Sequence, residues 1–222
     1  MVKVLTDLKA VFNDAKIVFW DFDGVIKDSV DVKTQAFQDL FESYGYNVAQ
    51  KVITHHLKNG GISRFEKIPL YLKSYAGQKL NDKIIAVYLE KFSNMVVQKV
   101  IDSPWVPGTL DAIKNKRSSQ KFILVTGTPH DEIHIILETL KIDRYFDTFY
   151  GSPNKKETII KQCLDSSVIS AVDCLYFGDS YTDYSAAKTN GVPFVYVNRS
   201  NDIDKRIIPN YMIQNFKEFI DA

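Results

Sequence analysis

The stretch Ile17-Val18-Phe19-Trp20-Asp21-Phe22-Asp23-Gly24 decides how the rest of the chain is interpreted. Its first four residues form an apolar run that ends in a turn signal, which is typical of a buried strand in a parallel sheet. Asp21 and Asp23 follow directly, and a buried strand does not carry unpaired carboxylates because their desolvation is very costly. We therefore expect both carboxylates at the carboxyl end of the strand, where open α/β sheets bind ligands, with a hard cation as their partner.

The bulk composition narrows the possible classes of function. Of the 222 residues, 45% are hydrophobic and 25% are charged, which is ordinary for a globular protein. The net charge of +1, without a basic stripe, argues against a nucleic-acid partner. With no secretory leader and no long apolar stretch in the sequence, we expect a cytoplasmic protein that does not enter a membrane. The two cysteines, Cys163 and Cys174, are too few for a disulfide framework.

The chain divides into a helical block and an alternating part. Residues 28–103 show helical periodicity and predict no strand, whereas strands and helices alternate from residue 104 onward, which predicts a parallel sheet. The predicted strands are 16–21, 121–126, 146–150, 173–178 and 193–197. The predicted helices are 5–14, 28–44, 48–57, 63–75, 82–100, 108–117, 130–140, 155–166, 183–190 and 215–220. We therefore predict an α/β protein with a Rossmann-like core, residues 1–27 and 104–222, and an inserted all-helical domain, residues 28–103.

Polar clusters follow four of the predicted strands. They are Asp21 and Asp23 after the first strand, Thr126-Gly127 after the second, Lys155 and Lys156 after the third, and Asp179 with Asp183 after the fourth. Because the carboxyl ends of parallel strands lie at one edge of a sheet, we expect these groups to converge on one site.

The residue types in these clusters suit phosphoryl transfer. One carboxylate can accept the phosphoryl group covalently, and a second can protonate the leaving group and then activate water. Several aspartates in one pocket repel each other, by about 4 kcal/mol for a pair about 4 Å apart at an effective dielectric constant of about 20. Mg²⁺ removes this repulsion because it prefers carboxylate and water oxygens. A threonine hydroxyl, the following amide and a lysine ammonium can hold the remaining phosphate oxygens.

The order of these motifs resembles that of the haloacid dehalogenase-like hydrolases. The matching segments are Asp21-Phe22-Asp23-Gly24-Val25, Val125-Thr126-Gly127-Thr128, a lysine after the third strand, and Gly178-Asp179-Ser180-x-x-Asp183. The resemblance covers nearly the whole chain. It makes the helical insertion similar to the cap domain of the phosphoglycolate phosphatase and β-phosphoglucomutase branch of that superfamily.

The resemblance implies a role for each matched residue. Asp21 would be the nucleophile and Asp23 the acid/base. Mg²⁺ would be bound by Asp21, by the backbone carbonyl of Asp23 and by Asp179, with Asp183 in support, often through water. Thr126, Gly127 and a lysine would bind the phosphate. The spacing Gly-Ser-Pro-x-x-Lys favours Lys156 over Lys155 for that lysine.

One segment of the insertion suggests a contact with substrate. Gly61-Ile62-Ser63-Arg64 resembles the cap specificity loop of β-phosphoglucomutase-like members, where the matching arginine contacts the distal part of a phosphosugar. The same segment also predicts a capping box between Ser63 and Glu66 at a helix start. Both interpretations can hold together, so Arg64 is a candidate for substrate binding.

Histidines elsewhere in the sequence do not predict a second metal site. His130 and His134 flank Glu132 as in a zinc-protease helix, but Asp131 stands where that motif needs the glutamate. We interpret His55 and His56 as ordinary residues of the helical insertion.

These observations favour a Mg²⁺-dependent phosphatase that hydrolyses a small phosphorylated metabolite through an aspartyl-phosphate intermediate. Among such metabolites, we expect sugar phosphates first. Dehalogenation needs no acid/base two residues after the nucleophile, so Asp23 argues against it. A phosphosugar mutase is the alternative, although Gly60 and Lys33 stand where β-phosphoglucomutase has a lysine and a histidine. A non-catalytic binding protein is a third hypothesis, which the intact aspartates and Thr126 disfavour. The sequence does not indicate an oligomeric state.

Overall fold

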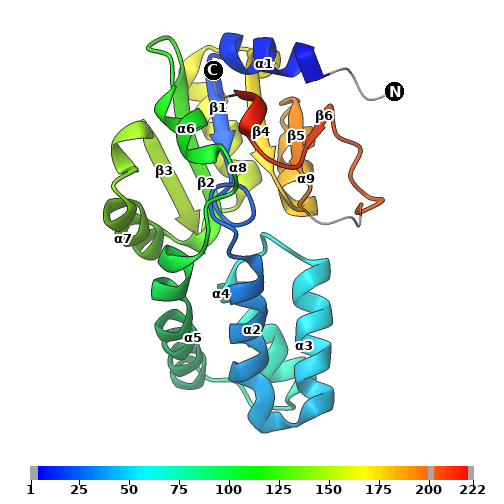
Figure 1. The fold of residues 1–222 in the computed structure, drawn as a ribbon. Helices are drawn as coiled ribbons and strands as arrows, with labels where there is room; N and C mark the ends of the chain where they lie inside the picture. Colours follow the sequence, from blue (N-terminus) through cyan, green and yellow to red (C-terminus); the bar gives the residue numbers. More distant parts are fainter. Residues whose placement is uncertain (1–4, 200–202, 220–222) are drawn as a thin grey trace.

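The computed structural model describes residues 5–199 and 203–219. A parallel six-stranded sheet forms one end of the molecule and a bundle of helices forms the other (Figure 1). No helix of the described part has the length and apolar character needed to cross a membrane.

The sheet has the strand order β3-β2-β1-β4-β5-β6, and every neighbouring pair is parallel. The strands are β1 (Ile17–Trp20), β2 (Lys121–Pro129), β3 (Thr148–Ser152), β4 (Cys174–Gly178), β5 (Phe194–Val197) and β6 (Tyr211–Ile213). The predicted parallel α/β sheet is therefore confirmed. Because β1 pairs with both β2 and β4, its carboxyl end lies at the point where the strand order reverses, which is the usual ligand site of such sheets.

Helices cover both faces of the sheet. Successive side chains of β1 point to opposite faces, so that Val18 and Trp20 pack in one apolar cluster and Ile17 and Phe19 in another. The first face is covered by α1 (Leu5–Asp14), α6 (Thr109–Lys114) and α7 (His130–Leu140), and the second by α8 (Lys156–Ser167) and α9 (Tyr181–Thr189). The near-complete burial of β1 explains why its sequence is a continuous apolar run.

Between β1 and β2 the described chain is helical, as predicted. The helices are α2 (Val30–Phe41), α3 (Tyr46–Lys58), α4 (Arg64–Leu70) and α5 (Asp82–Asp102), with a short π-helix over Tyr71–Tyr75. The expected helix 63–75 is therefore helical from Arg64 to Tyr75, but it changes from α to π hydrogen bonding after Leu70. Pro69 lies inside α4, and its missing N–H removes one helical hydrogen bond just before the change.

Two adjacent segments connect the helical block to the sheet. The amide of Asp28 donates to the carbonyl of Pro104 at 2.8 Å, and that of Val106 donates to Ile26 at 3.0 Å. The ammonium of Lys27 lies 4.5 Å from the ring centre of Trp105 and donates to a carbonyl of α5. These contacts hold the entry and the exit of the helical block side by side.

The C-terminal tail differs from the prediction. Before the expected helix 215–220, the strand β6 pairs with β5 at the sheet edge, and within the expected helix Lys217–Phe219 forms a short 3₁₀ helix. Residue 220 lies outside the described part of the chain. Three residues are too few to produce a readable strand pattern, so the edge strand was missed.

Candidate active site

Asp21 and Asp179 are placed side by side by their strands. Each is the first residue after its strand, β1 and β4, and these strands are neighbours in the sheet with Trp20 paired to Phe177. The amide of Asp21 also donates to the carbonyl of Phe177 at 2.9 Å. Two carboxylates far apart in the sequence therefore meet at the carboxyl edge of the sheet.

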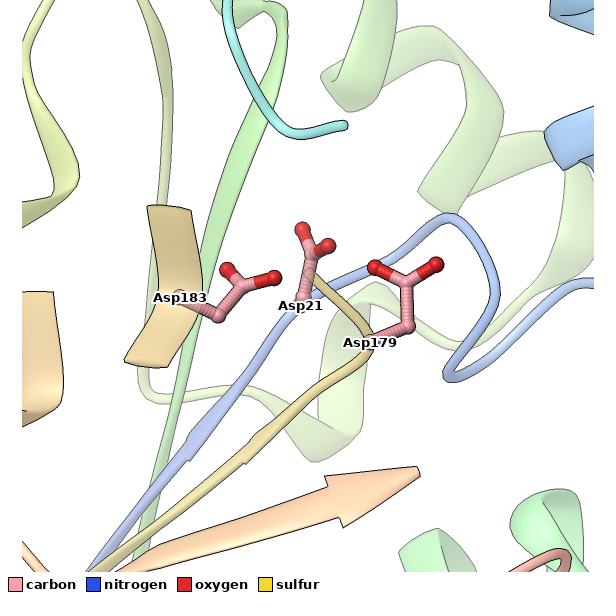
Figure 2. A group of neighbouring side chains, drawn as sticks. All are labelled: Asp21, Asp179 and Asp183. Atoms are coloured by element: carbon pink, nitrogen blue, oxygen red, sulfur yellow. The ribbon is translucent and has the colours of Figure 1, made fainter. Parts of the chain in front are cut away.

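Asp21, Asp179 and Asp183 form a cluster of carboxylates. One oxygen of each lies within 4.8 Å of the others, and Figure 2 shows the three groups pointing toward a common space. Burial and the neighbouring Asp183 raise the pKa of Asp21 to about 7. Burial and the charge of Asp21 raise the pKa of Asp179 well above its usual range. The raised pKa values show that the negative charge of the cluster is not fully compensated by nearby positive charge.

Gly24 allows Asp179 to approach the turn after β1. Its φ is +76°, and a Cβ at this position would overlap the carboxylate of Asp179. The glycine after the two aspartates is therefore required both by its left-handed backbone and by the space that Asp179 occupies.

Asp183 differs from the other two carboxylates because protein donors occupy both of its oxygens. Its Oδ1 accepts hydrogen bonds from Lys156 at 2.6 Å and from the Tyr176 hydroxyl at 2.7 Å. Its Oδ2 accepts from the backbone amide and the hydroxyl of Ser180, and Ser180 caps α9 in a capping box with Asp183. This side chain is fixed in place as part of the helix start.

Lys156 reaches the cluster, whereas Lys155 does not. The Nζ of Lys156 lies 2.8 Å from Asp21 Oδ1 and 2.6 Å from Asp183 Oδ1, and the side chain is buried. Burial opposes its charge, but Asp183 and Asp21 outweigh burial and raise the pKa of Lys156. Lys155 is exposed at the N-terminus of α8. The geometry therefore agrees with the spacing argument for Lys156.

Asp23 lies beside the cluster but pairs with the helical block. Its Oδ1 accepts a hydrogen bond from Ser29 at 2.6 Å, and its Oδ2 forms an ion pair with Lys33 of α2. Burial works against ionisation, but the Lys33 ammonium prevails and holds the pKa of Asp23 below its usual value. Lys33 also donates to the hydroxyl of Thr128 at 2.8 Å, so it connects Asp23 to the end of β2.

Thr126 and Gly127 lie under a loop of the helical block. The carbonyl of Gly61 is so close to Gly127 that a Cβ there would lie only 2.6 Å from the oxygen. On the other side of this loop, the hydroxyl of Thr182 donates to the carbonyl of Gly60 at 2.7 Å. The loop thus closes over the edge of the sheet, which explains two glycines in succession.

Arg64 is buried between the helical block and the core. Its Nη1 forms an ion pair with Glu132 of α7 at 2.8 Å and donates to Ser93 of α5 at 3.0 Å. Its guanidinium also lies 4.6 Å from the ring centre of Phe92. Arg64 lines the same cavity as the aspartates, but its charge is already paired. The predicted capping box is not formed as expected, since Ser63 accepts from the amide of Phe65 instead of Glu66.

The residues present fit a hard divalent cation. The donors are carboxylate oxygens, which Mg²⁺ prefers, and they converge at a partly open site. The carboxylate of Asp179 accepts no hydrogen bond from residues 5–199 and 203–219, in contrast to that of Asp183. A cation would relieve the repulsion that raises the pKa of Asp21 and Asp179.

Some residues at the site were not identified from the sequence. In the sequence, Lys33 stands out only as the residue in place of a mutase histidine, and Thr128 only as part of a motif. His56 has the pattern of an ordinary helical residue, and nothing marks Lys67. The cavity is lined by Lys33, His56 and Lys67, and Thr128 binds Asp23. His56 and Lys67 lie on facing helices and are buried, and it is their burial, which the sequence does not reveal, that points to a role in the site.

Comparison with known proteins agrees with this geometry. A family model described as haloacid dehalogenase-like hydrolase matches residues 18–197. The chain therefore belongs to the haloacid dehalogenase-like hydrolases, as its motifs predicted.

Two relatives and one solved structure show the range within this family. The chain is 24% identical over 186 residues to a phosphorylated carbohydrates phosphatase of Thermotoga maritima, covering 81% of this chain and 83% of that protein. It is 25% identical over 190 residues to phosphoglycolate phosphatase 1 of Pseudomonas aeruginosa, covering 80% of this chain and 67% of that protein. A solved structure of a protein proposed to be a β-phosphoglucomutase, also from Thermotoga maritima, superposes with a TM-score of 0.67 at 19% identity. The superposition covers 92% of this chain and 96% of that protein.

Proposed function

We propose that this protein is a Mg²⁺-dependent phosphatase that hydrolyses a small phosphorylated metabolite through an aspartyl-phosphate intermediate. The observation that carries the proposal is the meeting of Asp21, Asp179 and Lys156 at the carboxyl edge of the sheet. A nucleophilic carboxylate, a cation site and a fixed ammonium in one place are the parts that phosphoryl transfer to a side chain requires. The names of the two phosphatase relatives support the same reaction class.

We propose that residues 28–103 act as the cap of this enzyme and that residues 1–27 and 104–222 form its catalytic core. The hydrogen-bonded crossing segments at Asp28–Pro104 and Ile26–Val106 support this division. The contacts of Gly60 and Arg64 with the core suit a cap that closes over the substrate and excludes water.

In the proposed first step, a carboxylate oxygen of Asp21 attacks phosphorus and the bond from phosphorus to the ester oxygen breaks. The electron pair of that bond goes to the leaving oxygen, and Asp23 supplies its proton. Thr126, Gly127 and Lys156 would hold the other phosphate oxygens. Mg²⁺, held by Asp21, Asp179 and the backbone carbonyl of Asp23 with Asp183 in support, would supply positive charge that offsets the phosphate.

In the proposed second step, water attacks phosphorus of the aspartyl phosphate and Asp23 accepts its proton. The bond from phosphorus to Asp21 breaks, which releases phosphate and restores the carboxylate. Asp23 is ionised in its pair with Lys33, as this second step needs. In the first step Asp23 must be protonated, so its ion pair with Lys33 has to open. A phosphate oxygen of the substrate offers the Lys33 ammonium another anionic partner.

The test is Mg²⁺-dependent release of phosphate from a panel of sugar phosphates, phosphoglycolate and nucleotides. We expect release that stops when Mg²⁺ is removed with a chelator and resumes when it is restored. Isomerisation of a hexose phosphate without net release of phosphate would replace the phosphatase by the mutase alternative. Binding without turnover of any ester would favour the non-catalytic hypothesis.

A further inference from the structure

In the cavity above the aspartates, the carboxylates of the site face basic residues of the helical block. It has a volume of about 640 Å³ and extends from the edge of the sheet to the helical block. Asp21, Asp23 and Asp179 lie on the core side, which we call the floor. The helical block contributes the roof, whose basic residues are Lys33, His56, Arg64 and Lys67, together with Lys58, which is exposed to solvent.

The basic residues of the roof differ in whether an acid neutralises them. Lys33 pairs with Asp23, and Arg64 pairs with Glu132. Lys67 is only 2% exposed, yet it forms no ion pair with any carboxylate of the described chain. Its Nζ lies at hydrogen-bond distance, 3.0 Å, from Nδ1 of His56 and 5.8 Å from the ring centre of Phe37. Lys67 is therefore a buried cation that lines a cavity without a counter-ion.

His56 cannot supply the missing negative charge and does not add a positive one. Burial and the adjacent Lys67 lower the pKa of His56 to about 2, so its ring is neutral. The charged form of Lys67 can only donate, so beside it Nδ1 is the acceptor and the ring proton is on Nε2, which is a second donor. Burial, with the nearby Lys33, also lowers the pKa of Lys67 to about 7, and an anion beside it would restore its charge.

We infer that Lys67 and His56 form a second anion-binding subsite, and that the substrate is a phosphomonoester with a second anionic group, either a carboxylate or another phosphate. This inference rests on the proposed phosphatase function, which places the reacting phosphate at Asp21. The second anion pairs with Lys67 and accepts a hydrogen bond from His56. A neutral sugar phosphate offers Lys67 no counter-ion, and the charged form of this side chain is unfavourable in a buried place without one.

Three esters built on the same two-carbon unit test the inference. They are ethylene glycol phosphate, which is neutral at its far end, phosphoglycolate, which has a carboxylate there, and ethylene glycol bisphosphate, which has a second phosphate. We expect at least one of the two anionic esters to exceed the neutral ester in kcat/KM by on the order of 10- to 100-fold, as a charged hydrogen bond implies. The ester that is preferred then identifies the second anion as carboxylate or phosphate.

The variant Lys67→Met removes the charge at similar length. We expect it to lower the ratio of kcat/KM between the anionic and neutral esters by on the order of 10- to 100-fold. Differences in leaving-group reactivity cancel when each variant is compared with the wild type on the same esters. Lys51→Met, an exposed position on α3 outside the cavity, is the matched control and keeps the wild-type ratio. Lys67→Gln provides the same comparison if the methionine variant does not fold.

Two results would overturn the inference. The first is a wild-type enzyme that hydrolyses all three esters and para-nitrophenyl phosphate without preference for an anionic ester. The second is a preference that Lys67→Met or Lys67→Gln leaves unchanged. In both cases the phosphatase function stands, whereas absence of Mg²⁺-dependent release from every ester, including para-nitrophenyl phosphate, would remove the phosphatase function and the subsite with it.

Discussion

The floor and the roof of the cavity carry opposite charges, and different parts of the fold place them. The floor residues Asp21 and Asp179 directly follow neighbouring strands, so the register of the sheet alone brings them together. The roof residues His56 and Lys67 lie on α3 and α4, and they meet only because these helices pack against each other. The difference suggests that the floor determines the reaction and the roof determines which substrate is accepted.

The largest expected effect comes from removing the nucleophile of the floor. Asp21→Asn keeps the size of the side chain but cannot form an aspartyl phosphate, so we expect kcat to fall on the order of 10⁴-fold or more. Phosphate release under saturating Mg²⁺ measures this. Asp173→Asn is the control, because Asp173 pairs with Lys16 on the surface at the opposite end of β4. Equal activity of the two variants would show that Asp21 is not the nucleophile.

Within the floor, Asp179 and Asp183 should respond in opposite directions when Mg²⁺ is absent. Asp183→Asn leaves the buried Lys156 with less compensation, so we expect the free energy of unfolding to fall by about 3 kcal/mol. Asp179→Asn removes a carboxyl group whose pKa is raised in the folded protein, which means that its ionised form is unfavourable there. The metal-free variant should therefore be more stable, while its Mg²⁺ binding should be weaker. Denaturant unfolding with and without Mg²⁺ distinguishes the two. Destabilisation of the same size in both metal-free variants would contradict the different surroundings of these carboxylates.

In the roof, the pH dependence of stability should report the unpaired Lys67. Its pKa is about 7 in the folded protein and 10.5 in an ordinary environment, so the unfolded chain binds more protons between these values. The free energy of unfolding should therefore rise with pH across this range, by up to about 1.4 kcal/mol per pH unit from this group. The charged groups that act on it are Lys33, Asp23, Asp179 and Glu66.

Lys67→Met should lack this increase, so its stability advantage over the wild type should be largest near pH 7 and shrink toward pH 10. Urea unfolding at several pH values measures the difference. Parallel curves for the wild type and the variant would show that Lys67 is not a buried, uncompensated cation.

The smallest expected effect concerns the connection between roof and core. Glu132→Gln weakens the ion pair with Arg64, which should destabilise the closed arrangement by about 1 kcal/mol and raise KM about fivefold with little change in kcat. Glu138→Gln on the same helix is the control, because Glu138 lies on the surface, where it pairs with His134. If both variants have the same KM, the Arg64–Glu132 pair does not hold the cap closed.

The sequence predicted the floor better than the roof for a physical reason. Asp21 and Asp179 directly follow strands and Lys156 lies just after β3, where the local pattern of apolar run and polar turn is sufficient to locate them. Thr126 lies inside β2, which continues to Pro129 beyond the strand end predicted at residue 126. The parallel sheet was predictable for the same reason, apart from the three-residue edge strand β6. Local pattern therefore contains most of what is needed for the catalytic edge.

The roof could not be predicted in this way. The sequence makes Arg64 a candidate for substrate binding, but whether its charge is free depends on Glu132, which lies on a different layer of the molecule. The burial of Lys67 and the neutrality of His56 depend on how α2, α3 and α4 pack, and nothing in the local sequence distinguishes a buried helical lysine from an exposed one. Long-range packing determines these properties, so they become visible only in the folded structure.

The most direct test of the division between floor and roof is to trap the enzyme with acid during turnover and locate the phosphoryl group by peptide mass spectrometry. We predict a phosphoryl group on the peptide that contains Asp21 in both the wild type and Lys67→Met, and none in Asp21→Asn. A phosphoryl group on another residue, or its persistence in Asp21→Asn, would contradict the proposal that the carboxylate after β1 performs the chemistry.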